Sequence, residues 1–62
     1  MTGEIINIMG DGRYGIKCDD GIKRIGLLRG KLRRIINPQL GVKVDIELRD
    51  FEPFKCDIRC KV

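Results

Sequence analysis

Hydrophobic and charged residues alternate through the second half of the chain. In residues 42–49 every second side chain is apolar and each one between is charged, and residues 56–62 repeat this scheme. A period of two with β-branched residues is typical of strands that bury one face. We therefore predict strands over 42–49 and 56–62, with these side chains pointing inward: Val42, Val44, Ile46, Leu48, Cys56, Ile58, Cys60 and Val62.

Two glycine-containing turns divide the first half. Gly10-Asp11-Gly12 and Asp19-Asp20-Gly21 are each flanked by short runs rich in apolar residues. They predict three strands at about 4–9, 13–18 and 22–28, and such short turns join only antiparallel neighbours. The segment 29–41 follows, bracketed by Gly30 and Pro38, and residues 31–36 have room for a turn or two of helix. We expect Leu32 to anchor this segment to the strands.

The order of three strands, a short helical link and two strands predicts an all-β fold. It matches the five-stranded OB-fold, a Greek-key barrel. An SH3-like barrel also has five short strands, but its longest connection usually falls earlier in the chain. We expect one domain over 1–62, because 62 residues leave no room for a second. The predicted core is Ile6, Ile8, Ile16, Ile25, Leu27, Val44, Ile46, Leu48 and Ile58. Pro53 is expected to end strand pairing, and Phe51 and Phe54 to close the barrel end.

Positive charge is concentrated in one stretch of the chain. Between Lys23 and Arg34 lie six basic residues and no acidic one, which leaves seven of the 13 Lys and Arg residues against all nine carboxylates elsewhere. Such clustering indicates a polyanion site more than general solubility, since a solvated face normally mixes signs. The sequence therefore predicts nucleic-acid binding by this segment.

The composition argues against catalysis, metal binding and a membrane location. The chain has no histidine and no serine, so no catalytic constellation is visible, and we expect neither enzyme activity nor a cofactor. The Gly10–Gly15 match to a dinucleotide-binding loop is followed by a strand pattern where a helix would be required. Three cysteines, with Cys56 and Cys60 four apart, predict reduced thiols without a disulfide or a metal. Neither a membrane span nor a signal peptide is visible, which predicts a cytoplasmic protein.

Aromatic residues are few. Tyr14 lies on the second strand, where OB-folds bind ligands, but its parity matches Ile16 and Cys18, so base stacking and core packing both stay open. With little stacking available, phosphate contacts should dominate, which predicts recognition of RNA by shape more than by sequence.

Three spaced motifs carry a family resemblance. They are Gly10-Asp11-Gly12-Arg13, Asp20-Gly21-Ile22-Lys23-Arg24 and Arg29-Gly30-Lys31-Leu32-Arg33-Arg34, joined by Leu48-Arg49-Asp50-Phe51 after the fourth strand. Together they resemble eukaryotic and archaeal translation initiation factor 1A, whose core is an S1-like OB-fold, and residues 41–48 also resemble the bacterial initiation factor one. The resemblance implies a protein, expected to be a monomer, that occupies the A site of the small ribosomal subunit, with ribosomal RNA and other initiation factors as partners. The implied RNA contacts are Arg13, Tyr14, Lys23, Arg24, Arg29, Lys31, Arg33, Arg34 and Arg49.

The sequence also departs from the family pattern. The family often has a tryptophan just past the basic loop, where this chain has Asn37-Pro38. The family's basic N-terminal tail, helical extension and acidic C-terminal tail are not in this sequence, so we expect ribosome binding without the whole initiation function. The alternative is a general RNA or single-stranded DNA binder, or a protein-interaction module, that does not act on the ribosome.

Overall fold

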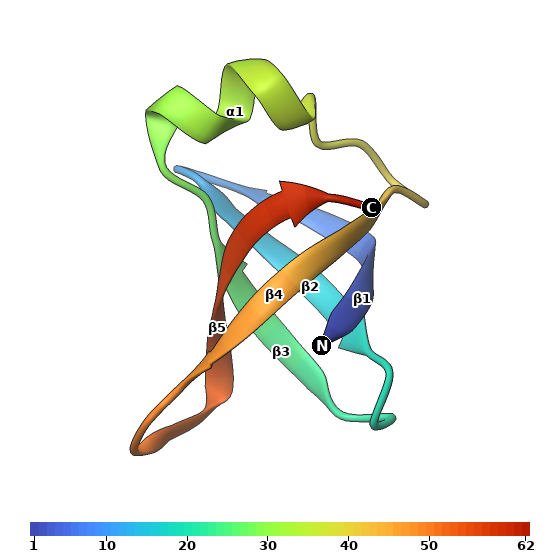
Figure 1. The fold of residues 1–62 in the computed structure, drawn as a ribbon, viewed down its shortest axis with the longest axis vertical. Coiled ribbons are helices and arrows are strands. Elements are labelled where there is room, and N and C mark those ends of the chain that lie inside the picture. The colour runs from blue at the N-terminus through green and yellow to red at the C-terminus, as the bar shows by residue number, and fades with distance from the viewer.

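Five strands and one short helix make up the structure, a computed structural model that describes residues 1–62. The strands form a closed barrel in the order β1-β2-β3-β5-β4, in which β1 pairs with β4 (Figure 1). All neighbours are antiparallel except β3 and β5, which run parallel. The predicted OB-type barrel is confirmed, as is the helical link after the third strand. The elements are β1 (Thr2–Gly10), β2 (Arg13–Cys18), β3 (Lys23–Leu27), α1 (Gly30–Ile36), β4 (Lys43–Arg49) and β5 (Glu52–Lys61).

Ten side chains form one core inside the barrel. Ile16, Val44, Ile46 and Ile58 were predicted there and are buried. Val42, just before β4, is half-buried and packs against this cluster, as its predicted inward direction requires. The full cluster is Ile5, Tyr14, Ile16, Cys18, Leu28, Ile36, Val44, Ile46, Cys56 and Ile58.

The predicted inner face of β1 is wrong. Ile5 is fully buried, whereas Ile6 is 39% exposed and Ile8 51% exposed. Ile5 pairs with Ile16, but the next pair is Asn7 with Gly15, so Ile6 is an extra residue in a β-bulge. The bulge shifts the alternation, so Ile5 is inward before it and Ile8 lies opposite the buried Tyr14 after it, although the Ile8 side chain stays half exposed.

The predicted inner face of β3 is also wrong. Ile25 and Leu27 are only half-buried, and the inward positions are Arg24, Gly26 and Leu28. Gly26 is inward because neighbouring side chains fill the space that its own would need. A Cβ placed there would lie 2.8 Å from Ile16 Cγ1 and 3.0 Å from Ile58 Cγ1.

A second bulge lies near the end of β5. Ile46 pairs with Ile58 and Asp45 with Cys60, which leaves Arg59 as the extra residue. Beyond it the parity reverses, so Cys60 is exposed, contrary to the prediction, and Val62 is 70% exposed.

The β4–β5 hairpin extends past the rest of the barrel (Figure 1). Leu48 pairs with buried Cys56 but is 43% exposed because it lies on this extension. The expectation that Phe51 and Phe54 close the barrel is wrong, since they are 102% and 66% exposed. Pro53 lies within β5, but residues 53–55 have no partner in β4, so the pairing is interrupted there as expected.

Other residues cover the two ends of the barrel. At the start of β3, the buried Arg24 donates from Nε to the Pro53 carbonyl oxygen (2.9 Å) and from Nη2 to Asp20 Oδ2 (2.9 Å). At the upper end lies α1, which inserts Ile36 into the core. The end that carries α1 is where the charged segment after β3 is displayed.

Candidate nucleic-acid interface

Two apolar side chains hold α1 on the barrel. Leu32 and Ile36 are four residues apart and therefore share one helix face, and both pack against the core, which confirms Leu32 as the anchor. The helix ends at Asn37, whose left-handed backbone (φ 50°) lets its N–H donate to the Arg33 carbonyl oxygen at 3.0 Å. Arg33 and Arg34 lie in the last turn, where the helix dipole favours positive charge.

The turn between β1 and β2 lies beside this helix. Leu28 donates its backbone N–H to the Gly12 carbonyl oxygen at 2.8 Å, which fixes the turn to the chain just before α1. A Cβ on Gly12 would lie 2.8 Å from the Leu28 carbonyl oxygen and 3.5 Å from Arg33 Nη2. Gly12 therefore allows this close approach, and Arg13, the next residue, lies at the same end of the barrel.

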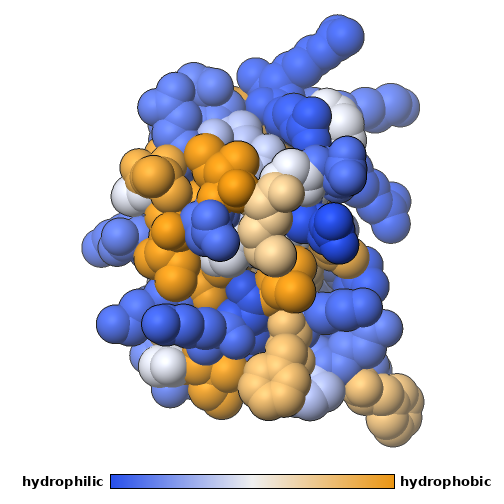
Figure 2. All heavy atoms as spheres, turned by 180° about the vertical axis from the view of Figure 1, so that it is seen from behind, coloured by the Kyte–Doolittle hydropathy of each residue, from blue (hydrophilic) through white to orange (hydrophobic).

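The structure thus brings five of the predicted contact residues together at the α1 end of the barrel. We call this set the basic end: Arg13, Arg29, Lys31, Arg33 and Arg34. All five are exposed, and none takes part in any of the five ion pairs of the structure. A hollow of about 460 Å³ is lined only by Gly30, Lys31 and Arg34. Figure 2 shows hydrophilic side chains over this upper end of the molecule.

Lys23 and Arg24 lie away from the basic end. Lys23 pairs with Lys17 at the far end of β2 from Arg13, four residues or about 13 Å along the strand. Arg24 is 8% exposed, and Asp20 holds it through two hydrogen bonds. This contact lowers the pKa of Asp20 and raises that of Arg24. The basic stretch of the sequence is therefore split by β3 into two separate places.

Two further residues that were predicted to contact RNA instead interact within the barrel. Tyr14 is 6% exposed and belongs to the core, so packing rather than stacking accounts for it. Arg49 donates to Asp57 (2.7 and 3.1 Å) and to Glu52 (3.2 Å), and the Asp57 hydrogen bonds are the main cause of the raised pKa of Arg49. Neither side chain is presented at the basic end.

Sequence reasoning missed the proximity of Gly12 to Arg33. The two residues are 21 apart, and the β2–β3 pairing, in which Arg13 lies opposite Leu27, brings them together. The available signal was the Gly10-Asp11-Gly12 turn, since a glycine often marks a close approach of two backbones.

The basic end offers positive charge that no carboxylate neutralises in an ion pair. Four of its five cations are arginines, and guanidinium groups match phosphate oxygens with two parallel hydrogen bonds. No three His, Cys, Asp or Glu side chains are grouped to hold a metal ion. Nor does the structure contain a helix of the length and apolarity needed to cross a membrane.

Comparison with known proteins gives a consistent result. The protein-family model described as "Translation initiation factor 1A / IF-1" matches residues 1–62. Eukaryotic translation initiation factor 1A of Schizosaccharomyces pombe is 36% identical over 61 residues, which are 98% of this chain and 44% of the relative. Translation initiation factor 1A of Pyrobaculum aerophilum is 41% identical over 58 residues, which are 94% of this chain and 51% of the relative.

A plant relative agrees with these two. Eukaryotic translation initiation factor 1A of Onobrychis viciifolia is 30% identical over 59 residues, 95% of this chain and 41% of the relative. The chain spans about half the length of the curated relatives it matches. These relatives are initiation factors, which are not a class of enzyme. With its closed five-stranded barrel and a match over its whole length, the chain belongs to the translation initiation factor 1A family.

Proposed function

We propose that this protein binds the small ribosomal subunit in the A site, with its basic end against phosphates of the decoding-centre RNA. One observation carries the proposal: five exposed cations gather at one end of the barrel with no carboxylate paired to any of them. Like charges repel, so such a cluster is stabilised when a polyanion lies against it. The family membership makes ribosomal RNA the relevant polyanion.

The proposed contact is made to the RNA backbone. With Tyr14 in the core, no aromatic side chain lies at the basic end to stack on a base. Phosphate contacts fix register and orientation but carry no sequence information. The protein would therefore recognise the folded shape of the RNA, in which several phosphates match the spacing of Arg13, Arg33 and Arg34.

The proposal narrows the set of contact residues from the nine that the resemblance implied. Arg13, Arg29, Lys31, Arg33 and Arg34 stay as RNA contacts. Arg24, Arg49 and Tyr14 are assigned to the stability of the barrel, and Lys23 lies outside the contact surface. We further propose that the protein is a monomer. It acts on cytoplasmic ribosomes together with other initiation factors.

Sedimentation with purified small subunits tests it. The tagged protein is centrifuged through a sucrose cushion with subunits and, separately, is measured against unrelated structured RNA at the same salt concentration. We expect saturable binding to subunits that excess unrelated RNA does not displace. Equal affinity for both would contradict a ribosomal role and favour a general RNA-binding module.

A further inference from the structure

The tip of the β4–β5 hairpin carries a phenylalanine that combines a fully exposed side chain with a left-handed backbone. Phe51 is 102% exposed, and its backbone φ is 64°. A left-handed backbone is disfavoured for bulky residues, and glycine or asparagine normally occupies such a turn position. The side chain is fully exposed and lies outside the core cluster, so the barrel gains no core packing from the phenyl ring. Strain and full exposure at one residue point to a function for it.

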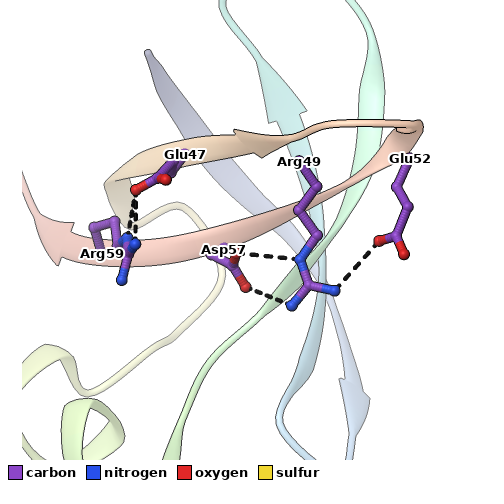
Figure 3. Close-up of polar contacts among 5 residues, drawn as sticks. All are labelled: Glu47, Arg49, Glu52, Asp57 and Arg59. Atoms are coloured by element: carbon purple, nitrogen blue, oxygen red, sulfur yellow. Dashed lines mark hydrogen bonds and ion pairs between the residues drawn. The ribbon is translucent and has the colours of Figure 1, made fainter.

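Three ion pairs join the two strands of the hairpin near Phe51. Arg49, just before the turn, donates from Nη1 to Glu52 Oε2 at 3.2 Å and from Nη2 to Asp57 Oδ1 at 2.7 Å. Figure 3 shows its guanidinium group between these two carboxylates, which lie at the turn and farther along β5. Glu47 and Arg59 add a third ion pair across the same two strands at 2.7 Å. These ion pairs restrict the conformations of the turn. The turn therefore loses less conformational entropy when it binds, which favours an anchoring role for the exposed ring.

The charge around Phe51 disfavours RNA as its partner. Asp50 and Glu52 are its immediate neighbours, and residues 47–57 hold four carboxylates and two cations. Phosphates placed against this surface would be repelled. The hairpin also lies at the opposite end of the long axis from α1 (Figure 1), so RNA bound to the basic end would not need to reach it.

We propose that Phe51 anchors the chain to a protein of the small subunit, by inserting its ring into an apolar pocket with a basic rim. This inference rests on the proposed function, because the partner is a protein of the small ribosomal subunit to which the chain is proposed to bind. Phe54, which is 66% exposed on the same hairpin, widens the apolar contact. Asp50, which forms no ion pair, faces the basic rim. A buried aromatic anchor surrounded by complementary charge is the usual composition of a binding hot spot.

The experiment replaces Phe51 with the photoreactive amino acid benzoylphenylalanine. The labelled protein is bound to purified small subunits and irradiated, and the product is digested with ribonuclease or with protease. We expect a cross-link to protein that survives ribonuclease. A cross-link to ribosomal RNA, or none above the irradiated free protein, would overturn the inference.

Binding of substituted proteins gives the second measurement. We expect Phe51→Ala to lower affinity for subunits about tenfold, the loss typical of an anchor residue. Its affinity for naked ribosomal RNA and its salt dependence should equal those of the wild type. Leu40→Ala, which removes a side chain that is 64% exposed outside the hairpin, is the matched control and should bind normally.

The outcomes separate the two proposals. If wild-type protein binds subunits and Phe51→Ala binds equally well, the anchor is refuted while the ribosomal function stands. If Phe51→Ala weakens binding to naked RNA as well, the ring contacts RNA and the protein partner is refuted. If the wild-type chain itself fails to bind subunits, the proposed function is refuted, and this partner with it.

Discussion

Gly26 decides how closely β2 and β5 can approach across the barrel. Its missing side chain leaves room for Ile16 and Ile58, both of which are almost completely buried. Its backbone lies between strand partners on both sides, Tyr14 in β2 and Cys56 in β5, so the main chain has little freedom to move away. A small barrel thus depends on the absence of a methyl group at one position.

We predict that Gly26→Ala destabilises the fold. The new Cβ would lie within 3.1 Å of three isoleucine side-chain atoms, and overpacking of this kind costs about 1–3 kcal/mol. That is a large share of the roughly 3–9 kcal/mol expected for a domain of this length. Urea denaturation of the variant measures the loss. Gly30→Ala, where no atom lies within 4 Å of the new Cβ, is the control and should leave the midpoint unchanged or raise it.

The stability of the fold depends on the ionisation of Asp57. The hydrogen bonds from Arg49 hold the pKa of Asp57 below its ordinary value of 3.8. Because the pKa is lower in the folded state than in the unfolded state, the stabilisation is present above about pH 4 and is lost as the pH falls through the folded value.

We therefore predict that Asp57→Asn is destabilising at pH 7 and much less so at pH 2.5. Urea midpoints of variant and wild type at both pH values make the comparison. Asp50→Asn is the control, because Asp50 forms no ion pair, and its effect should be small at both pH values. An equal loss for Asp57→Asn at the two pH values would mean that the charge of Asp57 contributes nothing.

At the scale of elements, all five strands and the helix could be predicted from periodicity and turns, but the inner faces of β1, β3 and the end of β5 could not. The bulges at Ile6 and Arg59 reverse the alternation, and a bulge is visible only when two strands are paired. In β3 the sequence Lys23-Arg24-Ile25-Gly26-Leu27-Leu28 is ambiguous, because its apolar residues occupy both parities. Packing against Ile16 and Ile58 resolves that ambiguity.

The bulge in β5 makes a testable prediction about its thiols. Cys60 is exposed beyond the bulge, whereas Cys56 is buried and its pKa is raised to about 11 by burial. Since the thiolate is the reactive form, only Cys60 should react rapidly with iodoacetamide at pH 8. Mass spectrometry of the native protein should show one fast label, located in the last residues of the chain. Slow labelling of Cys60 would show that β5 continues without the bulge, because Cys60 would then share the inward face of Cys56 and Ile58.

At the scale of the whole molecule, charge is distributed between two ends of one barrel. The cluster of cations could be predicted from the sequence, but not its division, since strand β3 carries Lys23 and Arg24 away from Arg29 and the residues of α1. The sequence also does not predict whether Arg13 lies near Lys23 and Arg24 or near α1. The structure answers this by placing the β1–β2 turn beside Arg33. The result is a cationic end around α1 and a hairpin with an acidic, aromatic tip. The two lie at opposite ends of the molecule (Figure 1).

The salt dependence of subunit binding, compared between two triple variants, tests the proposed function most directly. One variant replaces Lys31, Arg33 and Arg34 with Ala, and the other replaces Lys17, Lys23 and Lys55, which removes the same charge away from the basic end. Both should stay folded, because all six side chains are exposed. We predict that the first variant loses subunit binding and that its slope of log affinity against log salt falls by about 2–3, or roughly 0.7–0.9 for each lost phosphate contact. The second should change little. Unchanged affinity and slope in the first variant, or equal losses in both, would contradict the basic end as the RNA-binding surface.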